Sequence, residues 1–414
     1  MLSAGLAVAL LTFATPAGAW PSPRLVRVPS YDIEEQVVAY GRSQLLLLQP
    51  VGSHDPGITR VNLDGSIDRS FGNRGTVEIL CEDAVVTKGG RILVGTSSHP
   101  IGSRVRSDAR VTRLLPDGRR DPSFGVRGNT DVDFGGRYDT GQRVSLAVDG
   151  KILLAGFRQT FAVTRGESAA DPAVARLRPD GSLDPSFGKD GVKVVADGGE
   201  IEILDAAATP DGGVVVEVGS DIEAALWKLT DDGKVDLDFG RRGWLQLRGR
   251  RQKYGYHEEL FVAPQLAVLP GGKLLLAASG SPNRGPHRWE RVVAVRLRPD
   301  GRIDRSFGKN GWAETRKGRD TVSVEGLTLL PGGVLAVATT FIKPVNELHE
   351  FGAVAFDPDG HLERRFGEQG RCRFGFAAEG VGGATGVADL GRRAVVIGSG
   401  DSHLWLLACR LRKP

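Results

Sequence analysis

The chain repeats one short pattern of turns six times. The pattern is Asp-Gly-x-x-Asp-x-x-Phe-Gly-x-x-Gly between two apolar runs, and it reads LDGSIDRSFGNRG at residues 63–75 and PDGSLDPSFGKDG at residues 179–191. Successive phenylalanines of the pattern lie 53, 63, 52, 68 and 59 residues apart, at Phe71, Phe124, Phe187, Phe239, Phe307 and Phe366. A period of this length, formed by strand and turn residues, predicts one repeat architecture instead of several unrelated domains.

Each repeat contains four strand-like segments. In the fourth repeat they are residues 203–208, 214–218, 224–229 and 244–247, and turns rich in Pro, Asp and Gly separate them. Runs of β-branched residues and leucine that end in Gly, Pro or Asp are typical of strands joined by tight reversals. No segment of comparable length has a helical period. The chain is therefore predicted to be all-β.

The number of strands predicts a closed ring. The second and third strands occur seven times, whereas the fourth occurs six times because the chain stops at Pro414. One extra strand-like segment, residues 25–28, precedes the first complete set. We therefore expect a seven-bladed β-propeller of four-stranded blades, closed by the N-terminal strand, which would pair into the last blade beside Leu406. Closure would bury the two apolar blade faces that an open superhelical stack leaves exposed.

The recurring signature resembles the delta-60 repeat family, a β-propeller repeat of bacterial surface and secreted proteins. The resemblance covers residues 25–414, with departures at Arg119-Arg120, Leu237-Asp238 and Glu363 that affect single turns. It implies export and a propeller, and it implies no established chemistry.

The first 19 residues are predicted to be an export signal. Residues 6–13 are apolar, and Ala17-Gly18-Ala19 forms a small-x-small cleavage site, although no Lys or Arg precedes the apolar run. That run is too short to span a bilayer. We expect residues 20–414 to form a single propeller domain that is secreted, to the extracellular space or the periplasm, as a monomer without a membrane span.

Charge and cysteine content limit the function further. The net charge is +4, and the basic residues are spread along the chain without a cluster, so nucleic acid is not an expected partner. The three cysteines, Cys81, Cys372 and Cys409, fit no metal motif, and at least one of them must lie outside an intramolecular disulfide. We interpret them mainly as small buried hydrophobic side chains.

The second aspartate of each turn could bind calcium or could stabilise the turn. Calcium needs several oxygen ligands close together, and the motif offers two carboxylates plus backbone. An Asx-type turn, in which the carboxylate accepts hydrogen bonds from nearby amides while the phenylalanine anchors the turn between blades, needs no ion. We therefore predict an Asx-type turn, without a bound ion, at Asp68, Asp121, Asp184, Asp236 and Asp304.

Acidic residues also recur at the start of the first strands. If these strands line the axis, the carboxylates could ring the channel mouth, and their repulsion would raise some pKa values unless a cation or an arginine compensates. This predicts an axial site for a divalent cation such as Ca²⁺ or for a basic ligand; no other cofactor is expected. Alternatively, each carboxylate binds amides of its own blade. The ring would consist of Glu35, Glu82, Asp205 and Glu325, each eight residues before the second turn position, with Arg143 and Thr385 near the corresponding place in two other repeats.

The two faces of a propeller with this sequence should differ. Turns between first and second strands and between third and fourth strands share one face, and they are nearly invariant; we call it the constant-turn face. The remaining connections form the variable-loop face, where their length and composition change from repeat to repeat, as recognition loops do on a constant scaffold. Arginine with aromatic residues suits anionic or glycan-like partners. The candidate ligand-binding residues of this face are Arg137, Tyr138, Tyr254, Tyr256, His257, Arg284, His287 and Trp289.

We therefore expect an exported, non-enzymatic propeller scaffold that binds a protein or a glycan at the cell surface through its variable-loop face. The alternatives are an enzyme of hydrolase or lyase type, with its site at the axis, and a purely structural envelope component. No catalytic residue is predicted, because the sequence lacks His-x-x-x-His, paired cysteines and Gly-x-Ser-x-Gly. Convergence of His257, His287 and an acidic ring residue would favour the enzyme.

Overall fold

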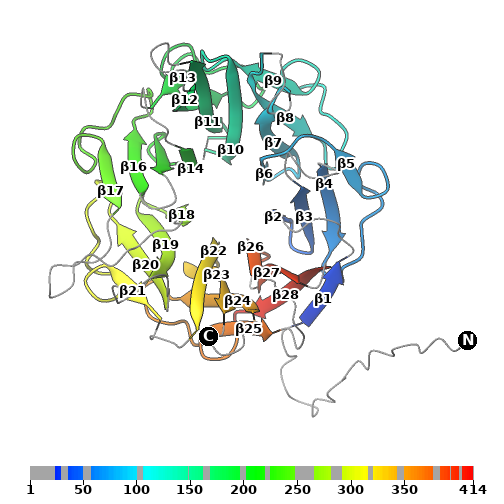
Figure 1. The fold of residues 1–414 in the computed structure, drawn as a ribbon, viewed down its shortest axis with the longest axis vertical. Helices are drawn as coiled ribbons and strands as arrows, with labels where there is room; N and C mark the ends of the chain where they lie inside the picture. Colours follow the sequence, from blue (N-terminus) through cyan, green and yellow to red (C-terminus); the bar gives the residue numbers. More distant parts are fainter. Residues whose placement is uncertain are drawn as a thin grey trace, which may run out of the picture.

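The protein is a seven-bladed β-propeller, as predicted (Figure 1). The computed structural model describes residues 24–28, 36–49, 57–99, 106–147, 149–161, 168–195, 202–219, 224–247, 265–280, 291–315, 320–342, 349–375, 383–391, 393–400 and 403–413. All regular elements in these ranges are strands, and they form seven four-stranded antiparallel sheets around a common axis. None of the described segments is a helix with the length and apolarity that a membrane crossing would require.

The blades follow the chain in order, each from the axis outward. Blade 1 contains β2 (Gln36–Tyr40), β3 (Gln44–Gln49), β4 (Gly57–Asn62) and β5 (Thr76–Glu78); blade 2 contains β6 (Asp83–Val86), β7 (Ile92–Ser97), β8 (Ala109–Leu114) and β9 (Asn129–Val132); blade 3 contains β10 (Tyr138–Leu146), β11 (Ile152–Phe161), β12 (Ser168–Leu177) and β13 (Val192–Val194); blade 4 contains β14 (Glu202–Ala208), β15 (Val214–Gly219), β16 (Ala224–Leu229) and β17 (Trp244–Leu247). Blade 5 contains β18 (Gln265–Val268), β19 (Leu274–Gly280), β20 (Arg291–Leu297) and β21 (Trp312–Glu314); blade 6 contains β22 (Thr321–Leu330), β23 (Val334–Ile342), β24 (His349–Phe356) and β25 (Arg371–Gly375); blade 7 contains β26 (Gly383–Asp389), β27 (Arg393–Gly400), β28 (His403–Arg410) and β1 (Arg24–Val28).

Blade 7 combines strands from both ends of the chain. Its order is β26-β27-β28-β1, and β1 pairs antiparallel with β28, so that Val26 lies opposite Leu406 and Val28 opposite Leu404. In Figure 1 the blue strand β1 accordingly lies along the red strand β28.

The core consists of separate apolar layers, one between each pair of neighbouring blades. Blades 1 and 2 share the layer that contains Leu46, Phe71 and Ile92, and blades 1 and 7 share the layer that contains Leu45 and Ile397. The second strand of each blade is therefore covered on both faces. This explains why β7 is buried along its whole length and why the second strands are continuous apolar runs. Because each blade shares one layer with the blade before it and another with the blade after it, every blade is held between two others.

The constant-turn face is built from a repeated arrangement of four side chains. In blade 3 the carboxylate of Asp184 accepts the backbone N–H and the hydroxyl of Ser186, as the Asx-type turn predicted. Its other oxygen accepts a hydrogen bond from Arg176 Nε at 2.8 Å, and the Arg176 guanidinium lies 4.9 Å from the centre of the Phe187 ring. The same set recurs with Arg60, Arg113 and Arg296, each eight residues before its aspartate.

Each turn is also tied to the next blade. The N–H of Gly188 donates to the carbonyl of Asp232 at 2.9 Å, and four further turns make the same bond. Gly188 has a φ of +58°, and a Cβ at this position would lie 2.2 Å from the carbonyl oxygen of Val192. Only glycine fits such a left-handed and crowded position without strain, which explains the first glycine of the Phe-Gly-x-x-Gly motif.

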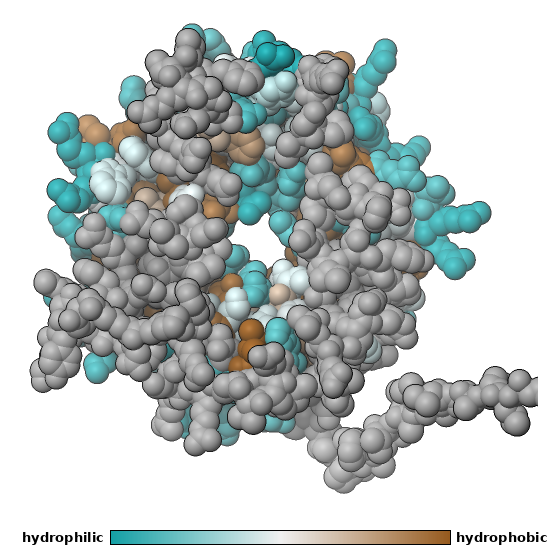
Figure 2. Space-filling model, viewed as in Figure 1, coloured by the Kyte–Doolittle hydropathy of each residue, from teal (hydrophilic) through white to brown (hydrophobic). Residues whose placement is uncertain are grey.

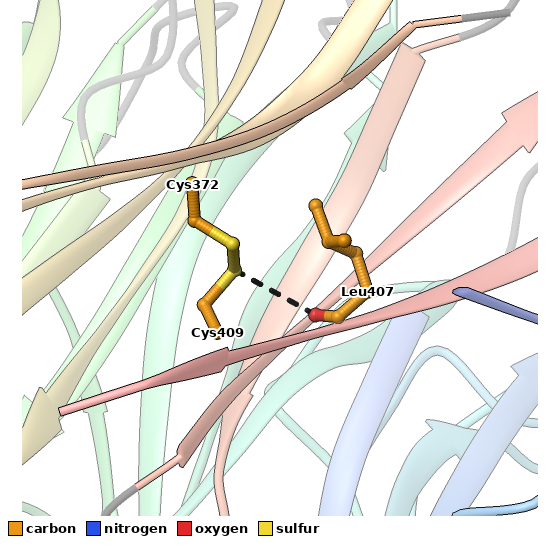
Figure 3. Close-up of a disulfide and its surroundings, with 3 residues drawn as sticks. All are labelled: Cys372, Leu407 and Cys409. Carbon is orange, nitrogen blue, oxygen red and sulfur yellow. Dashed lines mark hydrogen bonds between the residues drawn. A yellow bond between two sulfur atoms is a disulfide. The ribbon is translucent and has the colours of Figure 1, made fainter. Parts of the chain in front are cut away.

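One disulfide joins the last two blades. Cys372 on β25 is bonded to Cys409 on β28, and Cys409 Sγ lies 3.8 Å from the carbonyl oxygen of Leu407 (Figure 3). The interpretation of the cysteines as mere hydrophobic side chains is therefore wrong for this pair. Their positions on different blades could not be matched from sequence spacing. Cys81 is a free, buried thiol.

Candidate functional site

The first strands of the blades surround an opening at the centre of the ring. Figure 1 shows β6, β10 and β14 side by side at this inner wall, and Figure 2 shows an open centre bordered by both hydrophilic and hydrophobic side chains. The described titratable side chains of the wall are concentrated on blades 2, 3 and 4 as Glu82, Asp83, Arg143, Asp205 and Glu217. We call these five residues the axial cluster.

Three members of the axial cluster occupy the same place in consecutive blades. Asp83 pairs with Gly95, Arg143 with Ala155 and Asp205 with Glu217, each four residues before the turn that ends its strand. Register shifts next to Arg143 and Asp205 turn the local backbone, as a β-bulge does when it redirects a side chain. The wall therefore presents the sequence Asp, Arg, Asp around one side of the axis.

These three side chains reach from one blade to the next. Asp83 Oδ2 accepts the N–H of Val144 at 2.8 Å, and Arg143 Nε donates to the carbonyl of Leu204 at 3.0 Å. Asp205 accepts the N–H of Leu266 in the following blade. Asp83 and Asp205 also accept the N–H of the next residue in their own strands. Hydrogen bonding to backbone amides, which is the alternative expected from the sequence, therefore occupies much of the hydrogen-bonding capacity of Asp83 and Asp205. These bonds reach the next blade as well as their own.

Burial is the main cause of the pKa shifts in the axial cluster. It raises the pKa of Asp83 to about 6 and raises the pKa values of Glu82 and Asp205, while the positive charge of Arg143 opposes each shift. Repulsion between Asp83 and Asp205 contributes less to the pKa of Asp83. Arg143 therefore supplies the compensating charge, and desolvation, more than mutual repulsion, governs the pKa values.

Glu217 was missed by the sequence reasoning. Its side chain is completely buried, and within the described residues neither carboxyl oxygen has a hydrogen-bond partner. Burial, followed by the charge of Asp205, raises the pKa of Glu217 well above its usual range. A charged residue in the apolar run of β15 was the available signal, since the equivalent positions of β7 and β11 are Gly95 and Ala155.

The predicted acidic ring does not lie at one level. Gly90, Gly212 and Gly333 are the equivalent turn residues, because each donates its N–H to the carbonyl three residues earlier. Glu82 and Glu325 therefore share a position whose blade-4 counterpart is Leu204, and Asp205 lies one residue further along. The adjacent glycines Gly212 and Gly213 caused this shift of one residue in the sequence alignment. Glu35 lies outside the described residues.

On the variable-loop face, the described candidates are Arg137 and Tyr138. Arg137 is exposed, and its guanidinium lies 5.6 Å from the ring centre of half-buried Tyr138. The backbone N–H of Arg137 donates to Gln159 at 3.0 Å, and its carbonyl accepts from Ser107. The remaining six candidates, Tyr254, Tyr256, His257, Arg284, His287 and Trp289, lie outside the described residues, so convergence of His257 and His287 stays a prediction.

A group of aspartates supports the loops around Arg137. One oxygen each of Asp108, Asp133 and Asp139 lies within 4.8 Å of the others, a spacing that a cation could bridge. Arg106 already pairs with Asp133 and approaches Asp108 at 3.5 Å. Asp139 is fully buried and accepts the N–H groups of the turn over 134–136, while burial raises its pKa to about 7. The described part of this group therefore acts as a structural support for the loop.

The fold and the inner wall formed by the first strands together define a propeller repeat protein, and the comparisons with known proteins agree. Residues 90–124 and 149–187 match the family described as a domain of unknown function (DUF5122) β-propeller. No curated protein matches the chain.

Among solved structures, Raptor from Chaetomium thermophilum is similar over 94% of this chain and 29% of its own, with 9% identity and a TM-score of 0.53. YCF48 bound to D1 peptide has 10% identity, coverage of 97% and 100%, and a TM-score of 0.48. The polysaccharide lyase Uly1 has 12% identity, coverage of 94% and 99%, and a TM-score of 0.39. At such identities the likeness concerns the fold alone, and this chain spans less than a third of the Raptor chain.

Proposed function

We propose that this chain is an exported, non-enzymatic propeller that binds a protein or glycan partner through its variable-loop face. The observation that carries the proposal is the contrast between the two faces. On the constant-turn face the same Arg–Asp–Ser set recurs, and its polar groups bind one another or the next blade. On the opposite face the described loops differ between blades, and the exposed Arg137 lies beside an aromatic ring.

The loop around Arg137 is suited to recognition because it is held in place before a partner arrives. Asp139 binds two amides of the turn that precedes Arg137, and backbone hydrogen bonds fix Arg137 itself on both sides. A prearranged arginine and tyrosine lose little conformational entropy on binding. Such residues are also enriched at binding hot spots.

Export is supported by the disulfide between Cys372 and Cys409, since stable disulfides belong to oxidising compartments. The predicted signal at residues 1–19 and the resemblance to delta-60 repeats of bacterial surface proteins point the same way.

The enzyme alternative receives less support from the axial cluster. A general acid or base must reach its substrate, yet Glu217 is enclosed and Asp83 and Asp205 direct oxygens at backbone amides. The two oxygens of Glu217, which have no partner among the described residues, support a different role, uptake of a divalent cation such as Ca²⁺ at the axis, where the ion would displace the proton that burial keeps on Glu217. Following the melting temperature during titration with Ca²⁺ and Mg²⁺ tests that role, and an unchanged melting temperature at millimolar metal would remove it.

Site-specific photo-crosslinking tests the binding proposal. A photoreactive residue at position 137 should capture a partner from the native cell surface, whereas the same residue at exposed position 126 on the constant-turn face should not. Replacing Tyr138 by Ala should reduce capture at position 137. Equal capture at both positions, or none at position 137, would contradict the proposal.

A further inference from the structure

A large pocket opens on the constant-turn face between blades 4 and 5. Its volume is about 1160 Å³, and it lies between the third-to-fourth-strand turns of the two blades. Four arginines and two aliphatic side chains dominate its described lining: Arg241, Arg298, Arg302, Arg305, Leu245 and Ile303. We call this the arginine pocket. It lies on the face opposite the proposed partner-binding loops.

The arginine pocket has an excess of positive charge. Arg298 and Arg302 share one carboxylate, that of Asp300, at 3.3 and 3.7 Å. Among the described residues, the guanidinium groups of Arg241 and Arg305 have no hydrogen-bond or ion-pair partner, and both side chains are exposed. Asp304 also lines the pocket, but Arg296 and Lys273 each contact it at 2.8 Å and neutralise it.

The other blade junctions show that the fold does not require this charge. Every junction from blades 1–2 to blades 5–6 has the same glycine-to-carbonyl bond between turns, so the four arginine positions have direct equivalents. At the junction of blades 3 and 4 these equivalents are Lys189, Thr230, Lys234 and Leu237, and at that of blades 2 and 3 they are Val126, Arg178, Ser182 and Pro185. Four arginines occur together only at the junction of blades 4 and 5 among these five described junctions. If the packing of the turns required these arginines, arginine would be expected at the same positions of all five junctions.

The chemistry of the lining favours an anionic ligand. Guanidinium groups bind carboxylates through paired, charge-assisted hydrogen bonds. Ile303 is 43% exposed, and it offers apolar contact next to the arginines. No aromatic side chain occurs in the described lining, whereas aromatic platforms are typical of sites that bind single-stranded nucleic acid by stacking.

We infer that the arginine pocket is a second binding site, which takes an acidic peptide segment of a partner protein with aliphatic side chains between its carboxylates. The carboxylates pair with Arg241, Arg302 and Arg305, and the aliphatic groups cover Ile303 and Leu245. This site is independent of the variable-loop face.

The test uses a short fluorescent peptide of alternating aspartate and leucine, titrated with the full chain and followed by anisotropy. The double variant R241Q/R302Q should weaken binding about tenfold or more, because charge-assisted hydrogen bonds are lost. The matched control is K189Q/K234Q, which removes two charges from the equivalent positions of the neighbouring junction. It should change binding less than about twofold, since distant surface charges are screened.

Three results would overturn the inference. The first is no binding by the unaltered protein, and the second is equal weakening by both double variants, which would indicate diffuse attraction to a basic protein. The third is tighter binding of a polyuronate or a single-stranded oligonucleotide, competing with the peptide, which would assign the pocket to another class of ligand. I303S should weaken the aspartate–leucine peptide and leave an aspartate–serine peptide unaffected. Thermal melting of each variant checks that the fold is retained.

Discussion

Arg176 on β12 and Asp184 in the turn that follows form an ion pair at 2.8 Å in which both side chains are almost completely buried. The same guanidinium also reaches Asp231 in the next blade and stacks on Phe187. One arginine thus connects its own turn, the apolar anchor of that turn and the neighbouring blade.

Removing Asp184 should therefore be costly. We expect D184A to lower the free energy of unfolding by about 3–5 kcal/mol, because it leaves a buried guanidinium without its main partner. Denaturant unfolding measures this, with D232A as the control, since the Asp232 carboxylate binds Lys234 and Thr230 on the exposed surface and its loss should cost much less. A D184A variant as stable as D232A would show that the pair does not hold the turn.

The close approach at Gly188 predicts a graded response to alanine. G188A combines a φ of +58° with a clash against the Val192 carbonyl, so we expect a loss of about 2–3 kcal/mol or more. G271A is the matched control, because Gly271 has a φ of +81° but no atom within 4 Å of the added Cβ. It should cost only about 1 kcal/mol of backbone strain. Equal losses in the two variants would mean that the contact with the next strand is unimportant.

Asp139 should make stability depend on pH near neutrality. Burial raises its pKa to about 7 in the folded state, above the value in the unfolded chain, so the folded state retains this proton. The resulting stability is present at low pH and is lost as pH rises through about 7. D139N cannot titrate and should flatten this decline in urea unfolding, although its amide keeps an acceptor oxygen for only one of the N–H groups of Phe134 and Gly136. D180N, at an exposed carboxylate with a lowered pKa, should leave it unchanged. A slope that survives in D139N would contradict the assignment.

Glu217 predicts a second, separate dependence on pH. Because burial raises its pKa, the folded protein holds Glu217 neutral, and stability falls as pH rises through that raised pKa. E217Q should match the natural protein in acid and exceed its melting temperature at alkaline pH. A difference in melting temperature that is the same at all pH values would show that Glu217 does not titrate on unfolding.

The bond between Cys372 and Cys409 should contribute substantially to stability. It closes a loop with a sequence separation of 37 residues, for which the loss of entropy in the unfolded chain corresponds to about 4 kcal/mol. The double variant C372S/C409S should lose about this much stability in chemical unfolding. A reductant should destabilise the natural protein to a similar extent and leave the double variant unaffected. An effect of reductant on the double variant would point to another thiol.

The repeated motif made the fold predictable, whereas the candidate sites depend on single residues that differ from one repeat to the next. Phe71 and its equivalents, with the glycines that follow them, recur because each blade needs the same anchor and the same close approach, so counting was sufficient to find seven blades. An arginine eight residues before the turn aspartate recurs in four of the six turns, with Lys228 at this place in a fifth, and could have been found by the same reasoning. Glu217 is a departure from the repeat, whereas Arg305 has counterparts in Arg69 and Arg364. The importance of Glu217 and Arg305 depends on neighbours in another blade, which spacing along the chain does not reveal.

The sheet shared by β1 and β28 has a consequence for how such a ring can change its size. The unit that recurs in the sequence coincides with the blade in blades 1 to 6, whereas the sheet of blade 7 contains strands from both ends of the chain. An extra copy of the unit inserted between two turns would add a complete blade and leave the shared sheet intact. A copy added at either terminus would instead leave an unmatched strand. Growth of this architecture should therefore proceed by internal duplication, with the two ends staying together.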